Sequence, residues 1–168
     1  MLTDGVVALR PLREADVPQV VEACQDPLIS RFTRVPSPYT EAHARAALES
    51  DGDEIRRAIV EAGDDVRLLG LCSLLRFAPD APSCEVGYWL APWARGRGVA
   101  TRAVELICGW GFAKLALERI ELHAHRENGA SRAVAGRAGF AEFGTRVESD
   151  GRELVLYARS SSTARAAR

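Results

Sequence analysis

Four residues near the middle of the chain, Arg95-Gly96-Arg97-Gly98, have the composition of an anion-binding loop. A run with helical spacing follows them, so the loop should lie at a helix N-terminus, where unpaired N–H groups and a partial positive charge attract anions. Glycine lets the backbone approach an anion closely, and the arginine guanidinium offers forked donors to phosphate oxygens. The residues expected to hold a phosphate are Arg95, Gly96, Arg97, Gly98, Val99, Ala100 and Thr101.

Two familiar phosphate-binding loops do not fit this segment. A Walker loop ends in Gly-Lys-Ser or Gly-Lys-Thr, and the segment lacks that ending. A dinucleotide-binding fingerprint, Gly-x-Gly-x-x-Gly, would need a glycine where the chain has Thr101. Its glycines would also follow a strand directly, whereas residues 91–95 separate the preceding strand from Gly96. Neither loop is therefore expected here.

Two histidines, His123 and His125, stand two residues apart on a predicted strand and so share one of its faces. A protein metal site of this kind needs three or four ligands. The sequence offers no third ligand beside them, so we expect no metal.

The hydrophobic pattern of the chain alternates between strand and helix periods. Strands are predicted at 6–12, 56–61, 68–77, 84–90, 119–125, 143–148 and 153–159, and helices at 14–25, 40–50, 99–114 and 131–138. A hairpin turn is predicted at 62–67. This order of elements predicts an α/β (α+β) fold, with one mixed, mostly antiparallel sheet of about seven strands flanked by about four helices.

The composition is that of an ordinary globular protein. The length of 168 residues suits one domain, 47% of the residues are hydrophobic, and the formal net charge is −1. This charge gives no support to nucleic-acid binding. The N-terminus lacks the pattern of a secretory signal, and no run of about 18 apolar residues indicates a membrane span. The four cysteines are widely spaced, which is typical of reduced thiols in a cytoplasmic protein.

A single domain is expected to cover residues 1–159. The remaining segment, 160–168, reads SSSTARAAR and is small, polar and basic. Such a segment buries too little apolar surface to fold, so we expect a disordered C-terminal tail.

Three segments of the chain resemble a known family. They are EVGYWLAPWARGRGVATRAV at 85–104, NGASRAVAGRAGF at 128–140 and LRPLREADVPQVVEACQDP at 9–27. Together they resemble the GCN5-related N-acetyltransferase (GNAT) superfamily, and more closely its RimJ/RimL-like branch. The resemblance implies a single GNAT domain whose sheet splays between the strands at 84–90 and 119–125. It also implies that the bound anion is the pyrophosphate of an acyl-coenzyme A, usually acetyl-CoA.

Two residues of the strand at 84–90 would take part in the reaction, Leu90 by the resemblance and Glu85 as the carboxylate at the start of that strand. The backbone N–H of Leu90 would bind the cofactor's thioester and stabilise the tetrahedral oxyanion. Glu85 would accept the proton of the attacking amine, directly or through water. The alternative for Glu85 is an edge charge or a structural hydrogen-bond acceptor, because a shift of one residue in register would turn it away from the cleft.

A tyrosine that many members of the superfamily carry in the last helix is absent, since Ala135 stands at that position. By the resemblance, Ser131 would interact with the CoA sulfur instead, and Asn128 would hold the amide arm of the cofactor. The structural alternatives are an N-cap for Ser131 and an Asx-turn for Asn128. The segment 31–39 would form part of the acceptor wall.

The implied reaction moves an acetyl group from acetyl-CoA to a primary amine. Only a neutral amine attacks a thioester, and an α-amine with a pKa near 8 is far more often neutral than a lysine with a pKa near 10.4. With Glu85 as the one plausible carboxylate near the cleft, we expect a protein N-terminus or a small-molecule amine as the acceptor. Two alternatives stay open: transfer of another acyl group such as succinyl, and a non-catalytic acyl-CoA-binding sensor. A monomer or a homodimer is expected.

Overall fold

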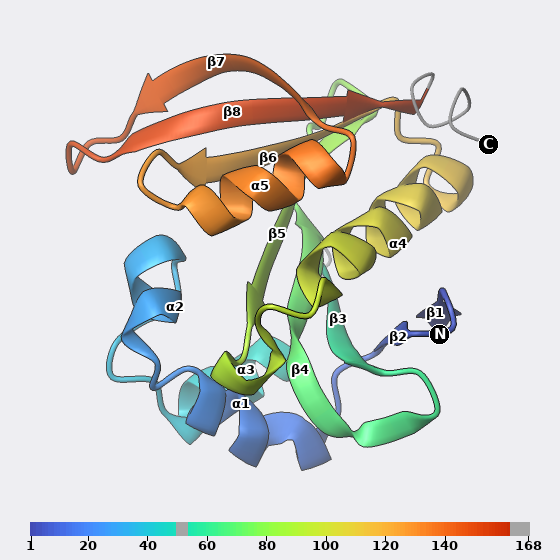
Figure 1. The fold of residues 1–168 in the computed structure, drawn as a ribbon, viewed down its shortest axis with the longest axis vertical. Coiled ribbons are helices and arrows are strands. Elements are labelled where there is room, and N and C mark those ends of the chain that lie inside the picture. Colours follow the sequence, from blue (N-terminus) through green and yellow to red (C-terminus); the bar gives the residue numbers. More distant parts are fainter. Residues whose placement is uncertain (50–53, 162–168) are drawn as a thin grey trace.

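The structure is a computed structural model that describes residues 1–49 and 54–161 of the chain (Figure 1). Its strands are β1 (Leu2–Thr3), β2 (Val7–Arg10), β3 (Glu54–Glu61), β4 (Asp64–Leu75), β5 (Ser83–Leu90), β6 (Arg119–His125), β7 (Ala141–Val147) and β8 (Glu153–Ser160). Its helices are α1 (Val17–Ala23), α2 (Pro27–Phe32), α3 (Glu41–Leu48), α4 (Val99–Lys114) and α5 (Gly129–Arg137), with 3₁₀ turns η1 (Glu14–Asp16) and η2 (Pro92–Ala94).

The strands of the described part form one sheet in the order β1-β2-β3-β4-β5-β6-β8-β7. Neighbouring strands are antiparallel, except that β5 and β6 run parallel. The predicted fold class is therefore confirmed: the chain is a single α/β domain with a mixed, mostly antiparallel sheet.

Two elements of the described part were not predicted, the short strand β1 and the helix α2. They raise the sheet to eight strands and the α-helices to five. The helix α2 begins at Pro27, directly after Asp26, whose side chain accepts a hydrogen bond from the Leu28 N–H at 2.8 Å. Proline suits the first turn of a helix because the N–H that it lacks would be unpaired there.

Some predicted boundaries were wrong by a few residues. The hairpin turn expected at 62–67 is shorter, because β4 begins at Asp64 and pairs there with Glu61. The domain extends past the expected end at residue 159, since Ser160 still pairs with Arg119 of β6. Residues 162–168 of the expected tail lie outside the described residues.

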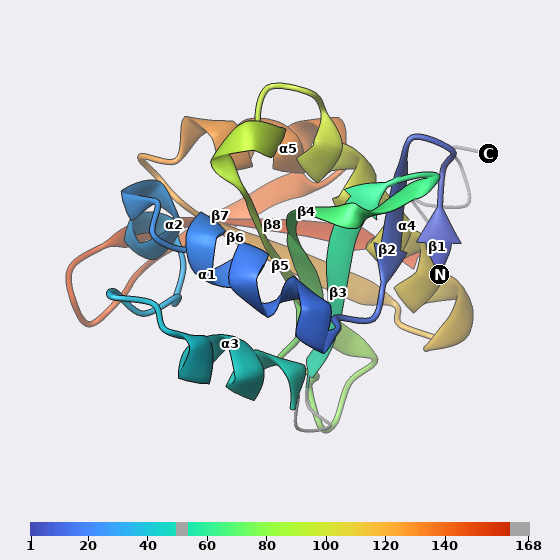
Figure 2. The same cartoon turned by 90° about the horizontal axis from the view of Figure 1, so that it is seen from below.

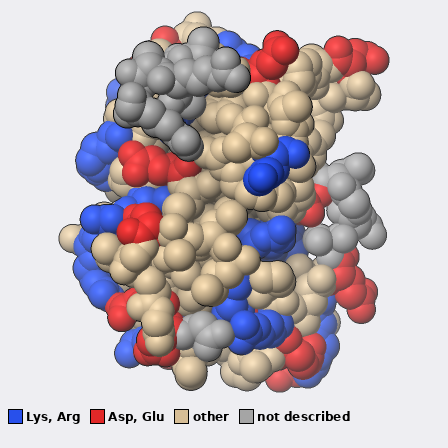
Figure 3. Space-filling model, turned by 90° about the vertical axis from the view of Figure 1, so that its right-hand side faces the viewer, with Lys and Arg blue, Asp and Glu red and all other residues tan. Residues whose placement is uncertain are grey.

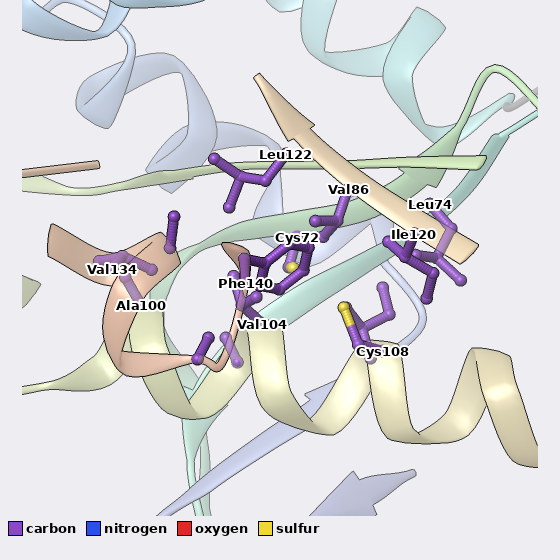
Figure 4. Close-up of a cluster of buried hydrophobic side chains, with 14 of the residues drawn as sticks. Cys72, Leu74, Val86, Ala100, Val104, Cys108, Ile120, Leu122, Val134 and Phe140 are labelled. Atoms are coloured by element: carbon purple, nitrogen blue, oxygen red, sulfur yellow. The ribbon is translucent and has the colours of Figure 1, made fainter. Parts of the chain in front are cut away.

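Helices cover both faces of the sheet. The views in Figures 1 and 2 place α4 and α5 against one face and α1 and α3 against the other. Each face has its own buried apolar cluster, and the larger one lies under α4 and α5 (Figure 4). That larger cluster includes Cys72 and Leu74 of β4, Val86 of β5, Val104 and Cys108 of α4, Ile120 and Leu122 of β6, and Val134 of α5.

The helix α4 has the predicted bounds and packs closely on the sheet. Its buried residues recur at helical spacing, and among them Gly111 permits the close approach. A Cβ atom at Gly111 would lie 3.0 Å from the side chain of Leu74 and 3.4 Å from that of Ile120. This packing holds the N-terminus of α4 beside the end of β5.

The surface carries charges of both signs. On the face shown in Figure 3, Lys and Arg side chains alternate with Asp and Glu side chains. Cys24, Cys72, Cys84 and Cys108 are buried and unpaired. None of the helices in the described ranges has the length and apolar character needed to cross a membrane.

Candidate active site

The strands β5 and β6 separate from one another soon after they begin. They pair at three positions, Ser83 with Arg119, Cys84 with Ile120 and Glu85 with Glu121. Beyond Glu85 they diverge, and Figure 1 shows β5 running nearly upright while β6 lies almost across it. The predicted splay between these two strands is therefore present.

The last residue of β5, Leu90, presents its N–H group to this gap. The N–H of the next residue, Ala91, donates to the carbonyl oxygen of Leu69 on β4 at 2.9 Å. Because successive N–H groups of a strand point to opposite edges, the N–H of Leu90 points away from β4 and toward the gap. The residue opposite it on β4 is Gly70, where a Cβ atom would lie 2.2 Å from the carbonyl oxygen of Trp89. A larger residue at Gly70 would therefore displace the end of β5.

The glycine loop lies between η2 and α4, as predicted. Gly98 is the N-cap of α4 and has a φ of 73°, and Gly96 has a φ of 75°. Both values lie in the left-handed region that side chains disfavour. A Cβ atom at either glycine would meet nothing within 4 Å, so the space beside the loop is open to a ligand.

The two arginines of the loop point in different directions. Arg95 lines the cavity described below, where it donates to the Leu90 carbonyl oxygen and to the Asp26 carboxylate, both at 3.1 Å. Arg97 instead pairs with Glu61 at 2.5 Å and is not among the residues that line this cavity. Because Glu61 ends β3 beside the loop, the structure does not bring the side chain of Arg97 to the predicted site.

The Asp26 carboxylate that binds Arg95 is held ionised. Burial acts to raise the pKa of Asp26, but the hydrogen bonds from Arg95 and from the Leu28 N–H lower it below its usual range. The ion pair fixes Arg95 beneath the glycine loop and ties that loop to the start of α2.

A cavity of about 1280 Å³ joins the loop, the splay and the helices α2 and α3. Apart from Arg97, the predicted site residues line it together: Glu85, Leu90, Arg95, Gly96, Gly98, Val99, Ala100, Thr101, Asn128 and Ser131. From the segment 31–39, which was expected to form the acceptor wall, it is lined by Phe32, Thr33, Arg34, Val35, Pro36 and Tyr39.

At the start of α5 the side chains of Asn128 and Ser131 have separate roles. Asn128 is the N-cap, and its side-chain oxygen accepts a hydrogen bond from the Ser131 N–H at 3.0 Å. The helix therefore begins at Gly129 rather than at the predicted residue 131, and Ser131 is not its cap. The hydroxyl of Ser131 accepts a hydrogen bond from the Tyr88 phenol of β5 at 3.1 Å.

Glu85 of β5 is among the residues that line the cavity. Its two oxygens lie 2.8 Å and 2.6 Å from one guanidinium nitrogen of Arg76. Both oxygens of the carboxylate therefore already accept hydrogen bonds from Arg76.

Polar residues that line the cavity but were not expected at the site from the sequence include Tyr88, His123 and Arg137. Tyr88 and Ser131 lie 43 positions apart, so no local spacing reveals their hydrogen bond. Arg137 donates to the Thr101 hydroxyl at 3.2 Å, but in the sequence it reads as the basic residue typical of a helix C-terminus. His123 was considered only as a metal ligand. In the part of the chain that the structure describes, no three His, Cys, Asp or Glu side chains are grouped so as to hold a metal ion.

A comparison with protein families identifies the class of this chain. The family model of the acetyltransferase (GNAT) domain matches residues 7–141. The chain therefore belongs to the GNAT acetyltransferase family, as the three sequence segments implied.

One curated relative is YdaF of Bacillus subtilis (strain 168), which is provisionally named a ribosomal N-acetyltransferase. The two sequences are 37% identical over 87 residues, which is 51% of this chain and 48% of YdaF. The chain therefore spans about half the length of this curated relative.

Two solved structures share the fold over almost the whole chain. The spermidine N-acetyltransferase of Vibrio cholerae, solved in complex with CoA and spermine, has a TM-score of 0.82 at 21% identity and covers 95% of this chain and 98% of its own. RimL, a ribosomal L7/L12 alpha-N-protein acetyltransferase solved in complex with coenzyme A, has a TM-score of 0.81 at 20% identity and the same two coverages. At these identities the likeness concerns the fold.

Proposed function

We propose that this protein is an N-acetyltransferase that moves the acetyl group of acetyl-CoA to a primary amine by direct attack. The observation that carries the proposal is the single cavity shared by the glycine loop, the splayed strands and the segment 31–39. One end of the cavity offers N–H groups and a guanidinium to a pyrophosphate, and the other end offers a carboxylate to an amine. We further propose a cytoplasmic enzyme that works as a monomer or a homodimer.

The cofactor would be held by the residues on the α4 and α5 side of the cavity. The N–H groups at the start of α4 and the guanidinium of Arg95 would bind the pyrophosphate. Arg137 lies at the same helix start and adds a cation there. Asn128, although it caps α5, would still meet the amide arm of CoA at the cavity wall.

The chain supplies groups for both charges that develop during the reaction. As the amine attacks the thioester carbon, the carbonyl oxygen becomes an oxyanion, and the N–H of Leu90 would stabilise it. The C–S bond then breaks, and the sulfur leaves as a thiolate beside Ser131. Overall the ammonium form of the amine loses two protons: one ends on the CoA sulfur and the other goes to a base.

The charges around the cavity favour an acceptor with a single amine. The carboxylates that line it are paired with arginines: Glu54 with Arg56, Glu85 with Arg76, and Glu148 with Arg152 and Arg34. A polyamine carries further ammonium groups, and it would need carboxylates that are not already neutralised. We therefore propose a protein α-amine or a small monoamine as the acceptor.

The test is a thiol-release assay with acetyl-CoA against three acceptor sets: peptides with a free N-terminus, N-blocked peptides with an internal lysine, and spermidine. We expect release of CoA with the first set in preference to the others. Turnover with succinyl-CoA but not with acetyl-CoA would show that the acyl donor is succinyl-CoA instead. Tight binding of CoA in calorimetry, with no turnover on any acceptor, would indicate an acyl-CoA-binding sensor instead.

A further inference from the structure

The imidazole of His123 lies between the carboxylates of Glu85 and Glu121, and it has no role in the function proposed above. It stands on β6 at the side of the cavity, and its side chain is only 9% exposed. Its Nε2 lies 2.9 Å from the carboxylate of Glu121, two residues earlier on the same strand. Its Nδ1 is buried, has no hydrogen-bond partner in the described part of the chain, and lies 3.4 Å from an oxygen of Glu85.

The carboxylate of Glu121 determines which imidazole nitrogen carries the proton. Burial acts to raise the pKa of Glu121, but the hydrogen bonds that it accepts from His123 and Arg119 lower it, so the group is ionised. An ionised carboxylate only accepts hydrogen bonds. The proton of the neutral imidazole must therefore sit on Nε2, which leaves the lone pair of Nδ1 directed at Glu85.

In this neutral tautomer, two hydrogen-bond acceptors face one another without a proton between them. An unpartnered buried nitrogen is costly, and a second acceptor 3.4 Å away does not relieve that cost. A primary ammonium group has three N–H donors and would satisfy both Glu85 and His123. Both residues line the cavity at the point where β5 and β6 begin to separate.

We propose that His123 is the base that takes the proton from the acceptor amine, and that Glu121 is its positioning residue. This inference rests on the proposed acetyltransferase function. Glu85 binds the ammonium, but both of its oxygens already accept hydrogen bonds from the guanidinium of Arg76. The Nδ1 of His123 has no hydrogen-bond partner among the described residues and is held in the tautomer that accepts a proton.

One N–H bond of the ammonium breaks, its proton bonds to Nδ1 of His123, and the freed electron pair of the amine forms the bond to the thioester carbon. The C–S bond then breaks with its electron pair on sulfur, and the second proton lost by the amine ends on that sulfur. The resulting imidazolium is stabilised by the carboxylates on both sides of it. Glu121 is partly exposed, with 26% of its side chain accessible, so the proton can pass to water from that side.

The groups around His123 set the expected pH dependence. Glu121 of β6 and Glu85 of β5 lie against the ring, Arg119 and Arg76 pair with these two carboxylates, and the partner of His123 on β8 is the apolar Leu156. The other titratable or charged side chains that line the same cavity are Arg34, Tyr39, His43, Glu54, Arg56, Tyr88, Arg95, His125, Arg137, Glu148 and Arg152. The two carboxylates nearest the ring both favour its protonated form. Removing the charge of Glu121 should therefore make the imidazolium less favourable and move the acid limb of the rate profile to lower pH.

The experiment compares His123→Gln with His125→Gln. His125 lies two residues further on the same face, and its ring packs against Phe32. In assays with acetyl-CoA and a peptide α-amine, His123→Gln should lower kcat by about 10²-fold at neutral pH, with a loss that shrinks as pH rises. In His125→Gln the acid limb of the rate profile should stay at the same pH as in the wild type. Glu121→Gln should shift that limb to lower pH, which a merely structural role would not do.

The outcomes separate this inference from the proposed function. Calorimetry should give the same affinity for acetyl-CoA in wild type and His123→Gln. If the wild type neither bound acetyl-CoA nor turned over any acceptor, the proposed function itself would be contradicted. Turnover by the wild type, together with a His123→Gln variant that retains kcat within about twofold, would overturn only the role of His123.

A spectroscopic measurement covers the case in which the variants do not fold. In ¹⁵N imidazole spectra of the wild type with CoA bound, His123 should show the proton on Nε2. Addition of a peptide α-amine should move the Nδ1 resonance. A proton on Nδ1, or an Nδ1 resonance that does not shift when the amine is added, would contradict the proposal.

Discussion

The phenol of Tyr88 on β5 donates a hydrogen bond to the hydroxyl of Ser131 on α5 at 3.1 Å. Burial raises the pKa of Tyr88 to about 12, so the phenol keeps its proton at neutral pH and acts as the donor. Because the oxygen of Ser131 accepts this proton, its own hydrogen is directed elsewhere, and the cavity lies beside it. The helix α5 has Ala135 where a tyrosine was looked for, and the tyrosine that contacts Ser131 comes from β5 instead.

The first prediction concerns this pair. Ser131→Ala should lower kcat by about 10- to 100-fold and change the KM for acetyl-CoA little, because the hydrogen bond to sulfur strengthens as thiolate charge develops. Since Asn128 is the cap of α5, the melting temperature should stay close to that of the wild type. Tyr88→Phe should have a smaller effect, and none when Ser131 is already alanine. Additive losses in this double-mutant cycle would mean that the two hydroxyls act independently.

The second prediction concerns the glycine loop. Gly98→Val should weaken CoA binding by well over tenfold, because a branched side chain would fill the space where the pyrophosphate is expected. The matched control is Gly63→Val in the β3–β4 hairpin, where φ is 88° and the surroundings are equally open. It imposes a similar backbone strain away from the cavity. Equal losses of CoA affinity in the two variants, measured by calorimetry, would assign the effect to strain alone.

The third prediction separates Glu85 from His123. Glu85→Gln should raise the KM for the amine by about tenfold and lower kcat less, since the carboxylate binds the ammonium while both of its oxygens accept hydrogen bonds from Arg76. Initial rates over a range of peptide concentrations give the two constants. A fall of kcat by about 10²-fold with an unchanged KM would instead make Glu85 the base, the role expected from the sequence.

The fourth prediction concerns the acceptor. At pH 7.4 an α-amine peptide should exceed an N-blocked lysine peptide in kcat/KM by about 10²-fold, which follows from the fractions of neutral amine at pKa values near 8 and 10.4. The ratio should fall as the pH is raised, because the lysine then loses its proton unaided. A ratio that does not change with pH would show that residues of the cavity, rather than amine basicity, select the acceptor.

Local pattern predicted the elements whose surroundings are uniform. The helix α4 and the strand β6 were predicted with the bounds that the structure shows, because each packs one regular face on the core. The glycine loop was also placed correctly between a strand and a helix, since its glycines and arginines are consecutive in the sequence. The helix α2 was missed because six residues carry too little periodicity to predict one.

Contacts between distant residues set the limit of prediction at the site. That Glu85 would meet Arg76, and that Arg97 would turn to Glu61, depends on how β3, β4 and β5 lie side by side. The pairing of Glu121 with His123 is local, but the significance of that pair depends on Glu85, which β5 brings to it from 38 positions away. Sequence pattern identifies such residues singly, and the sheet decides which of them meet.

The three residue pairs that join β5 to β6 have a thermodynamic consequence. Where the strands part, the sheet lacks the backbone hydrogen bonds that an uninterrupted one would have, and a bound cofactor is expected to fill that gap. A ligand that binds only the folded chain raises the free energy of unfolding, by about 2.7 kcal/mol at a hundred times its Kd. Acetyl-CoA would then stabilise the folded protein as well as serve as a substrate. The resistance of this protein to heat and proteolysis should increase with the concentration of the cofactor.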